Sequence, residues 1–136
     1  MSVLHTLHRL RQNARRESEV VVLRAQTERD AQAAKVLAMQ EHMRVARDAV
    51  NRDDPTDLAA WHAWRLRAEM EARREQARLA QRERDLDTAT RAHQKLVRDE
   101  ISMEKLLEAH AERARVEGLR KETRMLDEVG ARRRSE

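Results

Sequence analysis

Turn-forming residues are almost absent from this chain of 136 residues, which contains one proline and two glycines. The proline is Pro55, in the stretch "NRDDPTD", and the glycines are Gly118 and Gly130. A domain built from many strands or helices needs such residues at its connections. We therefore expect one well-marked break in the chain, with a long helix on either side of it.

Composition favours helices and argues against a large globular core. Charged residues make up 40% of the chain, and the mean hydropathy is -0.95. Phe, Tyr and Cys are missing, and the aromatic residues are Trp61 and Trp64. Much of the apolar content is alanine, which removes little area from water when it is buried. These features predict an all-α structure.

The break has the features of a helix start. Asp54 is a good N-cap residue, Pro55 suits the first helical position, and Asp57 lies at the third position, as in a capping box. The residue before a proline resists the α conformation, so the preceding helix must stop. We expect helices over 3–51 and 55–129, a turn over 52–55, and a frayed tail over 130–136 that begins with Gly130 as a C-cap.

The second helix carries a heptad repeat, which predicts packing against another helix in a coiled coil. Steps of three and four residues from Leu58 never change phase. Polar members of this seam, such as His93 and His110, are interpreted as register-setting residues. The seam consists of Leu58, Trp61, Arg65, Ala68, Ala72, Glu75, Leu79, Arg82, Leu86, Ala89, His93, Leu96, Glu100, Met103, Leu107, His110 and Ala114.

The first helix has two apolar seams that are out of phase. The early seam is Val3, Leu7, Leu10, Ala14, Glu17 and Val21, and the late seam is Val36, Met39, Met43, Ala46 and Val50. An extra step of four residues near Ala25 would join them. This interpretation predicts a stutter, which unwinds a coiled coil locally.

Folding the chain back at the turn would bring the two helices together with complementary partners. The expected pairs are Val50 with Leu58, Ala46 with Trp61, Met39 with Ala68, Val36 with Ala72, Val21 with Leu86, and Leu10 with Leu96. The sequence thus predicts a long antiparallel two-helix coiled coil, a helical hairpin that forms a single unit over 1–136. A parallel homodimer is the alternative, but it does not explain a capped turn at Asp54.

The longer second helix should extend beyond the hairpin, which leaves 108–129 as a C-terminal overhang. Two interpretations are open. The overhang is a frayed amphipathic end, because a bare helix of this length is marginal in water, or it is a docking surface for a groove or central cavity of another protein. Its apolar residues are Val116, Leu119, Met125, Leu126 and Val129, and they are set among the basic residues Arg113, Arg120, Lys121, Arg124 and Arg132.

Catalytic and metal-binding motifs are not found in the sequence. It has no Gly-rich phosphate loop and no cysteine, and its serines lack a nearby base, so neither an enzyme nor a cofactor is expected. His5 and His8 share a helix face, but no further ligand has a matching spacing, so no metal site is predicted. No apolar run of 18 residues and no signal peptide are present, and the lack of cysteine fits a reducing cytoplasm.

Nucleic-acid binding is a rival interpretation, because the formal net charge is +4 and basic residues are in excess near both ends. The sequence lacks zinc-finger spacing and an aromatic platform for bases, however, and its basic regions are rich in acids. A generic coiled-coil scaffold or a secretion chaperone is a further alternative.

Three segments resemble the FliJ family of flagellar export proteins and its YscO-type relatives in type III secretion. They are "LHTLHRLRQNARRESEV", "DLAAWHAWRLRAEME" and "EAHAERARVEGLRKETRMLDEVGARR", of which the last, with "RKETRMLDE", is the most specific. FliJ-like proteins are antiparallel two-helix coiled coils similar to the stalk of rotary ATP synthases. They project into the hexameric export ATPase (FliI-like) and contact the cytoplasmic domain of the export gate (FlhA-like).

This resemblance implies a protein that promotes ATPase ring assembly and couples it to the export gate in flagellum biogenesis or type III protein transport. Its location would be cytoplasmic, peripheral to the inner-membrane export apparatus, with export chaperones as further candidate partners. Trp64 matches a gate-facing position, although Ala68 and Glu69 follow where the family has a bulkier apolar residue. The ATPase-facing residues would be Leu7, Leu10, Arg11, Val116, Leu119, Arg120, Lys121, Arg124, Leu126 and Asp127.

Overall fold

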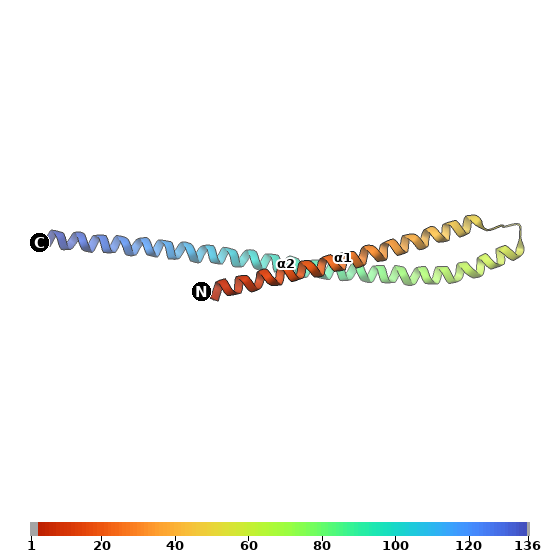
Figure 1. Cartoon of the computed structure of the whole chain (residues 1–136), viewed down its shortest axis with the longest axis horizontal. Coiled ribbons are helices and arrows are strands. Elements are labelled where there is room, and N and C mark those ends of the chain that lie inside the picture. Colours follow the sequence, from red (N-terminus) through yellow and green to blue (C-terminus); the bar gives the residue numbers. More distant parts are fainter. Residues whose placement is uncertain (1–2, 136) are drawn as a thin grey trace. The chain divides into compact units, whose positions relative to one another are not determined.

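The computed structural model describes residues 3–135, and two α-helices contain nearly all of them (Figure 1). Helix α1 spans Val3–Ala49 and helix α2 spans Pro55–Ser135. No strand occurs between residues 3 and 135. The predicted all-α class is confirmed.

The chain divides into two compact units, each of which contains a stretch of α1 and a stretch of α2. One unit is Arg16–Gln94, and the other combines Met1–Arg15 with Lys95–Glu136. Within Arg16–Gln94 the two helices run in opposite directions, because Ser18 contacts His93 whereas Gln32 contacts Glu75. The helices therefore form an antiparallel hairpin within one chain, as predicted, and the parallel homodimer is excluded as its fold.

The turn between the helices is held by the side chains of three polar residues. Asp54 Oδ1 accepts a hydrogen bond from the backbone N–H of Thr56 at 2.9 Å, so Asp54 is the N-cap of α2 as predicted. Asp57 does not complete a capping box with it. Its Oδ2 instead accepts from the backbone N–H of Asn51 at 2.6 Å, and Asn51 Oδ1 accepts from Asp53 N–H at 3.1 Å. These bonds join the end of α1 to the first turn of α2.

The predicted seam of α2 is confirmed over the length that α1 accompanies. Every seam position from Leu58 to Leu107 is buried or half-buried except Arg82, whose Nη1 lies 3.0 Å from Glu28 Oε2 of α1. His110 and Ala114 are exposed, because the described part of α1 begins at Val3 and no residue of it reaches their level.

The predicted seam of α1 is correct in its second half and wrong in its first half. The late seam continues towards the N-terminus in unbroken steps of three and four, without a stutter near Ala25. Val3, Leu7, Leu10 and Val21 of the predicted early seam are exposed on the outside. The residues that face α2 are Leu4, His8, Arg11, Arg15, Ser18, Val22, Ala25, Arg29 and Gln32, followed by Val36, Met39, Met43, Ala46 and Val50.

Cross-helix polar contacts explain why this inner face can be so polar. Ser18 Oγ and His93 Nδ1 share a hydrogen bond of 2.6 Å, and the guanidinium of Arg15 forms an ion pair with the buried Glu100 carboxylate. Buried polar groups cost little when they are paired in this way. Because these pairs replace apolar layers, the predicted pairs of Val21 with Leu86 and Leu10 with Leu96 do not form.

The helix ends differ slightly from the predicted bounds. Helix α1 stops at Ala49, two residues early, which is within the usual scatter of helix ends. Helix α2 continues through Gly130, which does not have the positive φ of a C-cap, so the tail from 130 to Ser135 is helical. Arg132, Arg133 and Arg134 in the last turn favour this extension, because cations stabilise the C-terminal end of a helix dipole.

Candidate partner-binding surfaces

Trp61 and Trp64 form an aromatic pair in the first turns of α2. Their ring centroids lie 5.5 Å apart with an interplanar angle of 27°, which is a stacked arrangement. Trp64 also meets the ring of His42 on α1 edge-on, at 5.6 Å and 64°. Trp61 is in the seam and Trp64 is beside it, so the pair connects the inside of the hairpin with one of its flanks.

A groove of about 560 Å³ lies beside Trp64 and has an apolar floor. Met39, Met43 and two alanines form that floor together with the indole, and Lys35, Arg67 and Glu71 are at its rim. Ala68 is part of the floor. Its small side chain leaves room beside the indole, while Glu69 lines a different groove on the other flank.

That second groove, of about 500 Å³, lies beside Trp61. Its floor is formed by Met43 and Trp61, and its walls carry arginines from both helices and from the turn. We call it the arginine groove; it is lined by Gln40, Met43, Arg44, Arg47, Arg52, Trp61, Arg65 and Glu69. This groove was not predicted from the sequence, in which Arg44 and Arg47 are three residues apart and Trp61 and Arg65 four residues apart, so that each pair shares a helix face.

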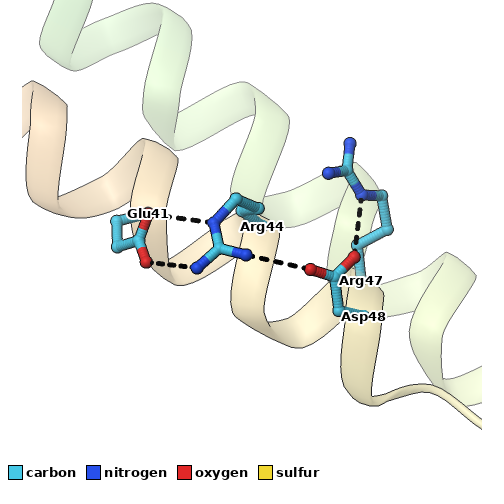
Figure 2. Close-up of polar contacts among 4 residues, drawn as sticks. All are labelled: Glu41, Arg44, Arg47 and Asp48. Carbon is cyan, nitrogen blue, oxygen red and sulfur yellow. Dashed lines mark hydrogen bonds and ion pairs between the residues drawn. The ribbon is translucent and has the colours of Figure 1, made fainter.

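A chain of ion pairs on α1 runs along part of the arginine groove (Figure 2). Arg44 donates to both carboxylate oxygens of Glu41, at 3.1 and 2.6 Å, and to Asp48 Oδ2 at 3.0 Å. Hydrogen bonding to Arg44 lowers the pKa of Glu41 and raises the pKa of Arg44. Arg47 approaches Asp48 through Nε only, at 3.6 Å, and Figure 2 shows its two terminal nitrogens on the side away from that carboxylate.

The C-terminal segment of α2 has no stretch of α1 beside it within the described residues, and Figure 1 shows it continuing past the start of α1. From Glu108 to Ser135 all residues are exposed except the half-buried Val116 and Gly130. Leu119 is 50% exposed and Leu126 is 72% exposed. The basic and acidic residues predicted for the ATPase-facing surface, Arg120, Lys121, Arg124 and Asp127, are exposed in the same segment.

The structure does not bring the N-terminal members of that predicted surface next to this segment. Leu7 and Leu10 are exposed on the outside of α1, and Arg11 is engaged with Asp99 at 3.5 Å. The level of Asp99 is far from Leu126, by roughly 40 Å along the axis at 1.5 Å per residue. The ten residues thus lie in two separate places rather than on one surface, and Arg11 and Val116 among them are half-buried.

His8 is half-buried with an Nδ1 that has no hydrogen-bond partner among residues 3–135. Within the same residues, no group of three or more His, Asp or Glu side chains is placed so that it could hold a metal ion. Neither described helix has a stretch apolar enough to cross a bilayer.

The fold and its surfaces define a helical hairpin with two grooves near its turn and an exposed C-terminal extension. Comparison with protein-family models, with curated proteins and with solved structures finds no match. The likeness to FliJ-type proteins therefore stays a prediction.

Proposed function

We propose that the chain is a stalk of the FliJ type, whose C-terminal extension enters a hexameric export ATPase and whose turn end contacts an export gate. The observation that carries this proposal is the exposed apolar stripe of α2 beyond the hairpin. Exposed apolar side chains in this arrangement favour insertion into a complementary groove or cavity of a partner, because burying their apolar area away from water is energetically favourable.

Two further features support the proposal. Residues Glu108–Ser135 stay helical while exposed to solvent, and ion pairs within the helix support them, such as Arg115 Nη2 to Glu112 Oε1 at 2.6 Å. At the turn end, Trp64 presents an indole beside an apolar groove, which is a favourable anchor for a protein partner. A slender helix bearing Leu119 and Leu126 is suited to a central channel, where it would favour ring assembly by mass action.

The test is stimulation of the cognate ATPase near its midpoint of hexamer assembly. We compare the full-length chain, a chain ending at Ala109, and the double variant Leu119→Asp with Leu126→Asp. The matched control is Leu23→Asp with Leu37→Asp, which changes two equally exposed leucines of α1. Stimulation should be lost on truncation and in the first pair only. Equal stimulation by the full-length and truncated chains would show that the C-terminal extension is not needed to stimulate the ATPase.

A generic coiled-coil scaffold or a secretion chaperone is the second candidate, and it predicts no stimulation by any of these chains. Nucleic-acid binding is distinguished by salt, because a phosphate-driven interaction weakens steeply as salt rises, whereas docking of an apolar stripe does not.

A further inference from the structure

We propose that the arginine groove beside Trp61 binds a short acidic peptide segment that carries one large apolar side chain. This site differs from the one assigned to Trp64 in the proposed function, and it does not depend on that function. The groove combines the apolar side chains of Met43 and Trp61 with arginines from α1, the turn and α2.

Several of these arginines have guanidinium nitrogens without a close carboxylate partner in the hairpin. Arg44 is the exception, because it forms ion pairs with Glu41 and Asp48. Arg52, in the turn, has no ion pair or hydrogen bond from its side chain to any residue between 3 and 135, and the terminal nitrogens of Arg47 point away from Asp48. Arg65 reaches Glu69 only at 3.7 Å. Guanidinium groups bind carboxylates in a two-pronged geometry, so carboxylates are the complementary ligand.

The floor of the groove specifies the rest of the ligand. Methionine adapts its shape to different apolar side chains, and tryptophan is enriched at the centres of protein interfaces. A volume of about 500 Å³ suits a few side chains of a peptide. A nucleic-acid backbone fits less well, because it carries no apolar side chain for the floor formed by Met43 and Trp61.

The arginine groove and the Trp64 groove lie on opposite flanks of the seam. Arg44 follows the seam residue Met43 and lines one groove, whereas His42 precedes Met43 and lines the other. Successive residues of a helix are about 100° apart, so these two side chains point to different sides. A peptide in the arginine groove would leave the outer flank of Trp64 accessible.

The experiment measures binding of a fluorescent peptide in which Glu and Asp residues surround one Phe, with full-length protein and anisotropy as the readout. A second peptide replaces Phe by Ser. The variant is Arg47→Gln with Arg52→Gln, and the matched control is Arg73→Gln with Lys95→Gln, two exposed residues of α2 that line neither groove. Helicity of each variant is checked by circular dichroism.

We expect the dissociation constant to rise about tenfold or more in the first variant and less than about twofold in the control, since charge-assisted contacts are lost only in the groove. Replacing Phe by Ser should weaken binding by a similar factor. Equal weakening in both variants, no effect of Phe, no binding by the unmodified protein, or tighter binding of single-stranded DNA of the same charge would each overturn the proposal.

Discussion

The side-chain amide of Gln32 donates two hydrogen bonds to Glu75, one to the carboxylate Oε2 at 2.6 Å and one to the backbone carbonyl at 3.0 Å. Glu75 is 3% exposed, and its other carboxylate oxygen, Oε1, lies 2.8 Å from Arg78 and 3.4 Å from Lys35. Gln32 and Lys35 belong to α1 and reach Glu75 in one alignment of the two helices, whereas Arg78 belongs to α2 itself. A slip of one helix past the other would take two of the three partners away from this buried carboxylate, which is unfavourable.

The first prediction concerns pH. Hydrogen bonding from Gln32, with Lys35 and Arg78, lowers the pKa of Glu75 below its ordinary value. A carboxyl group with a lowered folded-state pKa stabilises the fold above its unfolded pKa, about 4.3, and this stabilisation is lost as pH falls through the folded value. The melting temperature should therefore decrease when the pH is lowered below about 4. The variant Glu75→Gln should have a lower melting temperature at pH 7, and its melting temperature should decrease less on acidification.

The control for this pH series is Glu104→Gln, which changes an exposed acid of the same helix. It should keep the acid dependence of the unmodified chain. An unchanged acid dependence in Glu75→Gln would show that Glu75 is not responsible.

The second prediction tests the inner face of α1. Val22 is half-buried against α2, whereas its neighbour Val21 is 53% exposed. Val and Asn have similar helix propensities, so a Val→Asn exchange mainly reports burial. Val22→Asn should lower stability by about 1 to 2 kcal/mol, and Val21→Asn by less than about 0.5 kcal/mol, measured by urea unfolding. A larger loss of stability for Val21→Asn than for Val22→Asn would instead support the early seam that was predicted from apolar spacing.

The third prediction concerns pairing within the chain. Val36 is buried and Ala72 is half-buried on facing seams, so Val36→Cys with Ala72→Cys should crosslink inside one molecule under mild oxidation. The matched pair uses Leu37→Cys with Ala72→Cys, since Leu37 is 65% exposed. Only the first pair should yield a fast-migrating monomer on a non-reducing gel. Covalent dimers alone from the first pair would contradict the hairpin.

The fourth prediction concerns Trp64. Its contacts with Trp61 and His42 should make Trp64→Ala less stable by about 1 kcal/mol, with helicity retained. Binding to the cytoplasmic domain of the gate, measured by calorimetry, should be lost if the proposed function is correct. Leu66→Ala, at an equally apolar position that is 59% exposed, is the control and should bind normally. A large fall in melting temperature would assign Trp64 to the core.

Sequence reasoning predicted the fold because its signals are local. Pro55, Asp54 and the absence of other turn residues determine where the chain reverses, and the uninterrupted repeat of α2 determines which face is buried. Those signals come from backbone chemistry and helical spacing, which need no knowledge of the partner helix.

The phase of the first half of α1 could not be predicted in the same way. Its outer stripe of Val3, Leu7, Leu10 and Val21 is more apolar than its inner face, so counting apolar residues selects the wrong stripe. The inner face is chosen by cross-helix partners, such as Arg15 with Glu100 and Ser18 with His93, which only the folded pairing brings together. The arginine groove was missed for the same reason, since both helices and the turn contribute to it.

The C-terminal segment is one continuous helix, so the position of a side chain along its axis and its direction around the axis can be changed separately. Inserting seven residues after Glu112 would move Leu119 and Leu126 outward by about 10 Å while turning them by only about 20° around the axis. Inserting five residues would move them by about 7.5 Å and turn them by about 140°. The position of these leucines along the axis and their direction around it can therefore be varied almost independently, and a set of such insertions would measure the depth and direction of contact in the proposed insertion into a partner.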